Sequence, residues 1–387
     1  MGLGGDLHAP LEGVKVVELA RILAGPWAGQ TLADLGAQVI KVEAPAGDDT
    51  RRWGPPFLEI EGERVAAYFH ATNRGKKSVV ADFNDPQDLA RVKALIAEAD
   101  VVIENFKVGG LSRYGLDFDS LIEINPRLVY CSITGFGQNG PYATRAGYDF
   151  LIQGMAGWMD LTGAPDAEGV KSGVAFVDIF TGLYSVIAIQ AALAARGRTG
   201  RGQHIDMSLF DCATSVLANQ GMNYLVSGVC PTRMGNAHPN IVPYQQFRCA
   251  DGAIILAVGN DGQFVKFCDV VGLVARPDWA TNEGRVANRE AVVSAISDLL
   301  STRERGPVLA QLEAAGVPAG PINNVAQVFE DKQIIHREIH ADAGGVPSIS
   351  SPIRMSKTPV VSPRRAPKLG EDQSLLDRAT GPRDIGA

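Results

Sequence analysis

The sequence predicts an α/β protein: a larger part with a parallel β-sheet covered by helices on both faces, and a smaller α/β domain. Three observations support this fold class. Short apolar segments alternate with helical patterns through the first half of the chain. These segments have the composition of strands that are buried on both faces. A region with its own turns follows, in a chain whose 387 residues exceed the size at which one core usually keeps growing.

The first β-α-β unit lies close to the N-terminus. Residues 13–19 and 38–43 are predicted to be strands, and residues 26–35 to be the helix between them, with Pro26 near its first turn. The alternation continues with a helix at 86–97 and strands at 78–82, 100–104 and 128–133. The first half is therefore predicted to be Rossmann-like.

The second half begins with a long apolar pattern at residues 174–195, which predicts a buried helix. A basic turn at 196–203 follows, and we expect a solvated loop there rather than an anion site. A strand at 204–208 and a helical stretch near 209–224 complete this part.

The smaller domain is predicted from a separate set of turns and strands. Its features are a turn at 236–240, a segment at 244–249, a hairpin-like Asp251-Gly252 and an apolar strand at 254–258. From about Gly320 the chain is rich in proline, which predicts an extended segment that packs back along the larger domain.

Composition argues against several classes of partner. The hydrophobic fraction of 45% and the charged fraction of 20% are those of a globular enzyme. The formal net charge of -7 argues against nucleic acid or an anionic membrane as the main partner, because both need a basic surface. The N-terminal residues lack a basic segment followed by an apolar one, and no apolar run is long enough to span a bilayer. We therefore expect neither export nor a membrane anchor.

The five cysteines are widely spaced and form no C-x-x-C pair, so neither a zinc ribbon nor a disulfide framework is indicated. They are Cys131, Cys212, Cys230, Cys249 and Cys268. This pattern favours a protein of the reducing cytoplasm.

Two motifs suggest other chemistries. Residues 135–140 match the G-x-G-x-x-G pattern of dinucleotide sites, but they follow a late strand, and no acidic strand end comes at the usual distance. His336 and His340 have the i, i+4 spacing of helical metal ligands, but no third ligand is evident, and a charged helix end explains them better. We expect neither a nicotinamide cofactor nor a metal. The chain also has no G-x-S-x-G nucleophile motif and no P-loop.

Asp166 is the candidate nucleophile. It lies in a loop rich in glycine and proline between two apolar helical stretches, where a carboxylate can attack an activated acyl group. Pro-Asp is also a common turn dipeptide, and spacing alone favours an ordinary turn aspartate. The order of motifs along the rest of the chain must decide between these interpretations.

That order resembles the class III CoA-transferases, which include formyl-CoA:oxalate and carnitine-type enzymes and, by descent, α-methylacyl-CoA racemase. The resemblance runs nearly end to end. Its pieces are the segments 11–19, 24–26, 39–43, 47–51, 73–78, 104–110, 133–141, 147–149, 161–166 and 200–203. It implies that Asp166 is the catalytic carboxylate.

The implied mechanism is covalent. Asp166 attacks the acyl-CoA thioester to give a mixed anhydride and CoA thiolate, which then attacks the aspartyl carbonyl and is stored as an enzyme thioester. A small carboxylic acid forms a second anhydride on Asp166, and CoA returns to it. Thioester energy is kept throughout, so no metal or redox cofactor is required. Water must be excluded, because either intermediate would otherwise hydrolyse.

By motif position, the resemblance assigns thirteen residues to CoA. Backbone amides and basic side chains in this set suit its phosphates. They are Leu23, Ala24, Arg51, Arg74, Lys76, Asn105, Phe106, Lys107, Arg113, Thr134, Gly135, Phe136 and Gly137. Formyl-CoA transferase has an arginine where this chain has Ala44, and we expect Arg51 to compensate for it.

The acceptor pocket is assigned to Tyr148, His238 and Asn240. His238 and Asn240 lie where formyl-CoA transferase has its glycine-rich lid, which predicts a stiffer or differently hinged lid here. Segments 233–239 and 258–261 resemble the branch that acts on succinyl-CoA and other short dicarboxylic or carnitine-like acids, without specifying one acid.

Two other functions compete with the transferase. A racemase of this family would use a histidine and an aspartate, but Tyr148 stands at the histidine position, so Asp178, which aligns with the racemase acid, lacks its partner. A non-catalytic CoA-binding module is the other alternative, and an Asp166→Ala change that left the biochemical role intact would support it.

The resemblance also implies an interlocked homodimer. The family's domain limits place the larger domain at 1–200 and 320–387, a linker at 201–225, and the smaller domain with its return linker at 226–319.

Overall fold

The computed structural model describes residues 8–60, 62–361 and 363–379. The chain divides into two compact units. The larger unit contains the chain up to Ala156, the segment Ser172–Val226 and the chain from Lys332 onward. The smaller unit contains Gly157–Lys171 and Ser227–Asp331.

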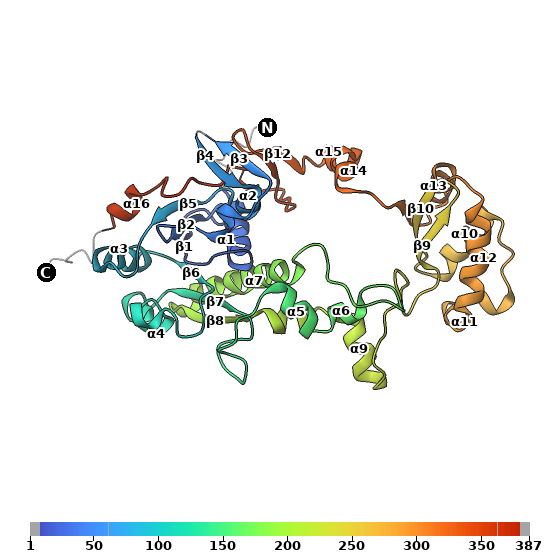
Figure 1. Ribbon diagram of the computed structural model, residues 1–387, viewed down its shortest axis with the longest axis horizontal. Helices are drawn as coiled ribbons and strands as arrows, with labels where there is room; N and C mark the ends of the chain where they lie inside the picture. The colour runs from blue at the N-terminus through green and yellow to red at the C-terminus, as the bar shows by residue number, and fades with distance from the viewer. Residues whose placement is uncertain (1–7, 61, 362, 380–387) are drawn as a thin grey trace. The chain divides into compact units, whose positions relative to one another are not determined.

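A six-stranded sheet forms the centre of the larger unit, and every pair of neighbouring strands is parallel (Figure 1). The order is β5-β2-β1-β6-β7-β8, which is the doubly wound order with its switch point between β1 and β6. The strands are β1 (Lys15–Glu18), β2 (Gln38–Glu43), β5 (Lys77–Val80), β6 (Val101–Glu104), β7 (Val129–Thr134) and β8 (Gln203–Ser208). The predicted parallel sheet is confirmed.

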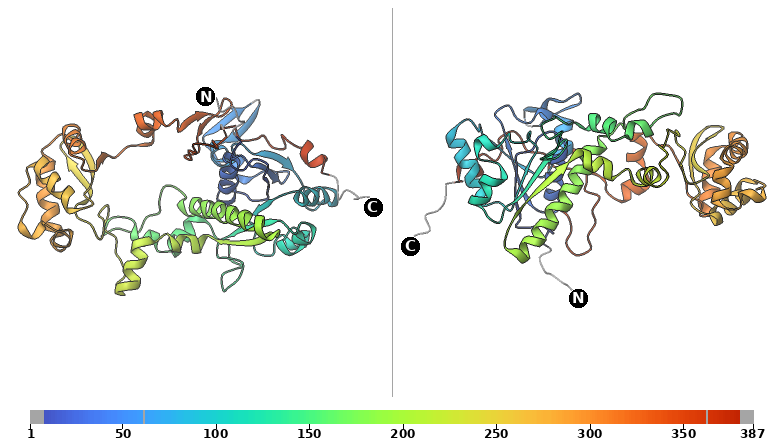
Figure 2. Two further views of the ribbon diagram at one scale, coloured as in Figure 1. Left: turned by 180° about the vertical axis from the view of Figure 1, so that it is seen from behind. Right: turned by 90° about the horizontal axis from the view of Figure 1, so that it is seen from below.

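Helices cover both faces of this sheet (Figure 2). Helices α1 (Ala24–Asp34) and α7 (Phe176–Thr199) pack against each other, and α7 also contacts β7 and β8. The opposite face buries apolar side chains against α3 (Pro86–Ala97), α4 (Phe118–Ile124) and α16 (Ser374–Asp377). Sheet strands buried on both sides explain the continuous apolar runs in the sequence.

Helix α7 is, within the described chain, the one helix long and apolar enough to cross a membrane by length and composition. Its contacts with α1 and two strands are those of a core helix of an α/β sheet. The helix ends at Thr199, and the φ of 73° at the following Gly200 suits glycine. Most of the expected basic turn at 196–203 is therefore helix or strand, and Arg196 binds the Asp100 carboxylate at 2.7 Å.

The remaining elements of the larger unit are short. They are the hairpin β3 (Phe57–Ile60) and β4 (Glu63–Ala66), the 3₁₀ turns η1 (Asp49–Arg52) and η2 (Ser112–Tyr114), the helices α2 (Ala67–Asn73), α5 (Asp149–Met155), α8 (Leu209–Ser215), α9 (Ala218–Ser227) and α15 (Lys332–His336), and the strands β12 (His340–Asp342) and β13 (Pro347–Ile349). Because α15 ends at His336 and His340 begins a strand, the two histidines do not share a helix face. Within the described residues no cluster suited to a metal ion is found.

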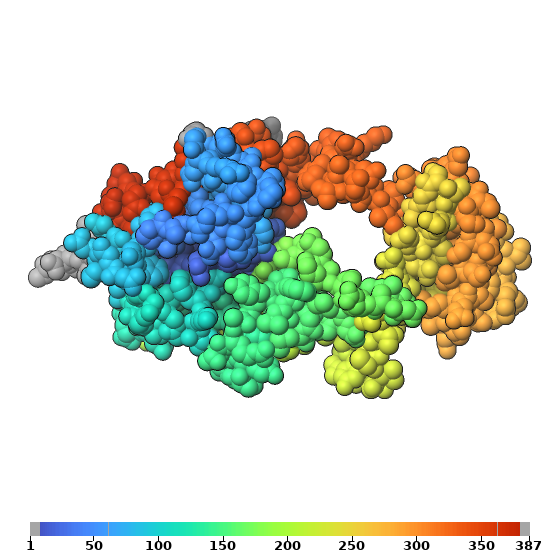
Figure 3. All heavy atoms as spheres, in the orientation of Figure 1, coloured from blue at the N-terminus to red at the C-terminus, as the bar shows by residue number. Residues whose placement is uncertain are grey.

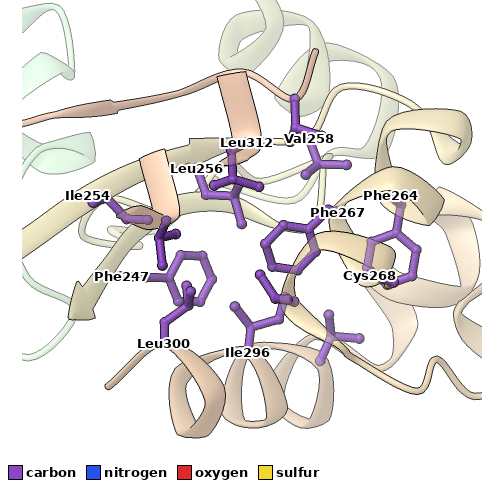
Figure 4. Packing of buried hydrophobic residues seen from close by; sticks show 14 of the residues in the cluster. Phe247, Ile254, Leu256, Val258, Phe264, Phe267, Cys268, Ile296, Leu300 and Leu312 are labelled. Carbon is purple, nitrogen blue, oxygen red and sulfur yellow. The ribbon is translucent and has the colours of Figure 1, made fainter. Parts of the chain in front are cut away.

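The smaller unit has its own antiparallel sheet in the order β11-β10-β9 and its own apolar core, in which Phe247, Phe264, Phe267 and Ile296 are fully or almost fully buried (Figure 4). Its elements are α6 (Trp158–Leu161), β9 (Tyr244–Cys249), β10 (Gly252–Ala257), α10 (Asp261–Val271), η3 (Pro277–Trp279), α11 (Asn282–Ala287), α12 (Arg289–Ser301), α13 (Arg305–Ala314), β11 (Ala319–Pro321) and α14 (Val325–Glu330). The predicted smaller α/β part is thus present.

The unit boundaries differ from the expected limits for two physical reasons. Strand β8 pairs with β7 along its whole length, so it belongs to the larger sheet and not to a linker at 201–225. Strand β11 pairs with β10, which holds the chain near residue 320 in the smaller unit.

Candidate active site

A cavity of ≈ 520 Å³ opens in the larger unit at the carboxyl ends of β1, β6 and β7. These ends flank the switch point of the sheet, which is where doubly wound proteins bind ligands. The lining residues come from the β1–α1 turn, the loop after β6, the loop between β7 and α5, and the starts of α7 and α8. They are 21–24, 105–110, Arg113, 133–135, Ala143, 145–148, Asp178 and Leu209.

The β1–α1 turn is tied to the loop after β6. The Arg21 amide donates to Asn105 Oδ1 at 2.9 Å, and Asn105 Nδ2 donates to the Arg21 carbonyl at 2.7 Å. Ile22 has a left-handed φ of 72°, an unfavourable conformation for a β-branched residue. Its amide is bound by the Asp48 carboxylate at 3.3 Å. This turn presents Leu23, Ala24 and the N-terminus of α1 to the cavity, a position that favours anions when basic side chains are nearby.

Four basic side chains line the cavity: Arg21, Lys107, Arg113 and Arg145. Arg21 forms an exposed ion pair with Asp49 at 3.3 Å. Arg113 Nη2 donates to the hydroxyl of Tyr114 at 2.6 Å. This excess of positive charge suits an anionic ligand.

Among the described residues that line the cavity, Asp178 is the only acidic one. Burial, together with the nearby Asp149 carboxylate, raises the pKa of its carboxyl to about 7. Asp149 caps the start of α7 by accepting hydrogen bonds from the amides of Val177 at 2.9 Å and Asp178 at 3.4 Å. Tyr148 precedes it and is 65% exposed on the cavity wall.

The glycine pattern at 135–140 has a packing explanation. A Cβ on Gly135 would lie 2.6 Å from the Cα of Gly147, so two loops approach here through glycine alone. Gly137 has a φ of 89°, and its amide donates to Thr134 Oγ1 at 2.9 Å. Thr134 and Gly135 line the cavity, whereas Phe136 and Gly137 do not, because Phe136 is buried between aromatic neighbours.

Three residues expected at the CoA phosphates do not line this cavity. Arg51 makes a bidentate pair with Glu43 at 2.7 and 2.8 Å. Arg74 is held by Asp34. Lys76 is fully buried and binds Glu18 at 2.8 Å, and burial lowers its pKa to about 8. These cations neutralise buried acids, and their contacts are those of structural ion pairs.

Asp166 lies in the smaller unit, within the segment Gly157–Lys171. The loop around it is closed by the Val170 amide, which donates to the Thr162 carbonyl at 3.0 Å. An ion pair of 2.9 Å between Asp160 and Arg233 braces its start. The Asp166 side chain is exposed and has no hydrogen bond or ion pair with the described residues, so its carboxylate is available to a substrate.

The three residues expected in the acceptor pocket belong to different units. Tyr148 lies in the larger unit, and His238 and Asn240 lie in the smaller one. His238 Nδ1 accepts from the Asn240 amide at 3.1 Å, and its ring packs on Tyr244. The backbone of this turn is held by Arg289, which donates to the carbonyls of His238 and Pro239. The turn is therefore braced by side chains and contains no glycine-rich hinge.

Comparison with known proteins identifies the class of enzyme. The sequence pattern described as CoA-transferase family III matches residues 11–373. The chain therefore belongs to this family and is a CoA-transferase that acts on acyl-CoA.

Relatives of this chain, including one with a solved structure, match it over almost its whole length. The succinate–glutarate CoA-transferase of Agrobacterium fabrum is 55% identical over 95% of this chain and 94% of its own length. The human succinyl-CoA:glutarate CoA-transferase is 41% identical over 96% of this chain and 88% of its own length. A crystal structure of a CAIB/BAIF family protein from Brucella suis is 60% identical, covers 96% of this chain and 99% of its own, and superposes with a TM-score of 0.87.

Arg21 and Arg145 were missed by the sequence interpretation. Arg21 could have been found from its position directly after the first strand, where ligands of doubly wound proteins bind. Arg145 lies in an irregular loop, where the sequence offers no comparable signal.

Proposed function

We propose that this enzyme transfers CoA between succinyl-CoA and glutarate. The observation that carries this proposal is the close similarity, over nearly full length, to two enzymes named for these substrates. The basic lining of the cavity supports it, because CoA and both acids are anionic.

In the proposed reaction, the Asp166 carboxylate attacks the succinyl thioester and releases CoA thiolate, which leaves a succinyl–aspartyl anhydride. The thiolate attacks the aspartyl carbonyl, so that succinate leaves and CoA is held as an aspartyl thioester. Glutarate attacks this thioester to give a glutaryl–aspartyl anhydride and thiolate again. Attack of the thiolate on the glutaryl carbonyl forms glutaryl-CoA and restores Asp166. The exposed, unpartnered carboxylate of Asp166 supports its role as nucleophile.

CoA is proposed to bind in the cavity of the larger unit. Its phosphates would be bound by Lys107, Arg113 and the N-terminus of α1 at Leu23 and Ala24, since these groups combine charge with free backbone donors. Asn105 and Phe106 would contact the nucleotide. Thr134 and Gly135 would contact the pantetheine arm.

We further propose that the protein forms a homodimer, of the interlocked kind that the family resemblance implies. Support comes from apolar side chains that the single chain leaves exposed on α7 and α9. They include Tyr184, Ile187, Met222, Leu225 and Val226. The atoms of α9 are the yellow-green group at the bottom of Figure 3.

The covalent step is tested by incubating the enzyme with succinyl-CoA and hydroxylamine. We expect conversion of Asp166 to its hydroxamate, seen by peptide mass spectrometry, together with loss of activity. Asp166→Ala should abolish formation of glutaryl-CoA, whereas Glu168→Gln, which removes an exposed carboxylate two residues away, should retain it. Full transfer by Asp166→Ala, or an unmodified Asp166 during turnover, would contradict the mechanism.

A further inference from the structure

Arg145 is a basic residue of the cavity wall that is positioned without an acidic partner. It lies between β7 and α5, in a loop that also contributes Ala143, Ala146 and Tyr148 to the lining. Its guanidinium lies over two aromatic rings, 5.2 Å from the centre of Phe136 and 4.5 Å from that of Tyr142. No carboxylate among the described residues forms an ion pair with it.

The aromatic rings orient the side chain without using its hydrogen-bond donors. Phe136 is 9% exposed and packs against Phe210 at 5.8 Å, and the more exposed ring of Tyr142 packs in turn on Phe136. A cation–π contact leaves the N–H groups of a guanidinium free at its edge. These donors match the geometry of a carboxylate, to which arginine binds in a bidentate manner.

The position of Arg145 separates it from the other basic residues of the cavity. Arg21 comes from the β1–α1 turn, and Lys107 and Arg113 come from the loop after β6. Arg145 shares its loop with Tyr148, and the next residue, Asp149, hydrogen-bonds to the amide of Asp178. The cavity therefore has one cation on the wall formed by the β7–α5 loop, in addition to those beside the N-terminus of α1.

We propose that Arg145 binds the distal carboxylate of the dicarboxylic acid and so selects dicarboxylic over monocarboxylic substrates. This inference rests on the proposed function. A five-carbon monocarboxylic acid of the same length, pentanoate, would leave the guanidinium unpaired. A site built to pair a polar group discriminates strongly against an analogue that lacks it.

Internal competition tests this role. The enzyme is given succinyl-CoA with equal concentrations of glutarate and pentanoate, and the ratio of glutaryl-CoA to pentanoyl-CoA is measured by mass spectrometry. Because both acids compete for the same enzyme thioester, this ratio is independent of the donor half of the reaction. We expect Arg145→Gln to lower the ratio at least about 10-fold and Arg145→Lys to restore part of it.

Arg113→Gln is the matched control. It should raise the KM for succinyl-CoA and leave the product ratio unchanged, since it removes a proposed phosphate contact. A wild-type ratio in Arg145→Gln would overturn the inference, and a raised KM for succinyl-CoA in the same variant would assign Arg145 to CoA instead. Circular dichroism and thermal unfolding verify that each variant is folded.

Failure of the proposed function can be distinguished from failure of the role proposed for Arg145. If the wild type formed no glutaryl-CoA but accepted another dicarboxylic acid of three to six carbons, the glutarate assignment would be wrong. The role of Arg145 would still be decided by competition between that acid and the monocarboxylic acid of the same length, measured as the ratio of the two acyl-CoA products. A wild type that accepted only monocarboxylic acids would overturn both.

Discussion

Asp178 combines a cavity position with a carboxyl group that favours its protonated form. Its pKa is raised to about 7, from 3.8 in the unfolded chain, first by burial and then by Asp149. The folded protein therefore holds a proton that the unfolded chain has lost between these two values. The contribution of Asp178 to the free energy of unfolding therefore falls as the pH rises from 3.8 to about 7, and it stays constant above pH 7.

Asp178→Asn should remove this pH-dependent loss, because the amide remains neutral. Relative to the wild type, the variant should gain more unfolding free energy at pH 8 than at pH 4, by at most about 4 kcal/mol, the full value of this pKa shift. Urea unfolding at both values measures this, with Asp269→Asn, on the exposed surface of α10, as the control. An identical pH dependence in Asp178→Asn and the wild type would contradict the expected protonation.

Lys76 and Lys107 form a matched pair that separates a structural lysine from a ligand-binding one. Lys76 is buried and binds Glu18, the carbonyl of Pro26 and Asn73 at 2.8 to 2.9 Å. Lys107 is exposed on the cavity wall. Removing one partner of a buried pair leaves the other charge uncompensated, which is far more costly than removing a solvated cation.

We therefore expect Lys76→Ala to lose about 3 kcal/mol of unfolding free energy, with little change in the KM for succinyl-CoA of the folded fraction. Lys107→Ala should show the opposite behaviour, with unchanged stability and a KM raised several-fold. Denaturant titration and initial-rate kinetics on both variants check this. A stable Lys76→Ala with weakened CoA binding would instead place Lys76 at the phosphates.

At the scale of elements, the sequence predicts the sheet well and the helix ends less well. Strands β1, β2, β6 and β7 were predicted because burial on both faces makes them continuously apolar. Helix α7 extends to Thr199 although the pattern at 196–203 indicates a turn, since Arg196 satisfies its charge on Asp100, which is distant in the sequence. The stretch near 209–224 is two helices, separated where Ala218 has a φ of 48°.

The candidate site, too, was predicted only in part, because some of its contacts join residues that are distant in the sequence. Leu23, Ala24, Lys107 and Thr134 were predicted and line the cavity, because the ends of parallel strands meet at one edge of the sheet. Lys76 was assigned to phosphate by its motif position in the family resemblance, and the partner it has in the structure, Glu18, lies 58 residues away. A single sequence does not show whether a cation faces a ligand or a buried acid.

At the scale of the whole molecule, the two units carry different parts of the proposed chemistry. The larger unit supplies the cavity and its basic residues, and the smaller unit supplies Asp166. Each unit has its own apolar core. A substitution in one core is therefore expected to act first within its own unit.

The exposed apolar side chains include Ile187 on α7 at 62% and Leu225 on α9 at 74%, and the proposed dimer would bury such side chains. Light scattering after gel filtration should give a mass twice that of the 41.1 kDa chain. Combining Ile187→Glu with Leu225→Glu should shift the mass toward one chain, because two carboxylates would be buried unpaired at the interface. Val274→Glu, at a 90% exposed position of the smaller unit, should not change it. A single-chain mass for the wild type at micromolar concentration would contradict the proposed dimer.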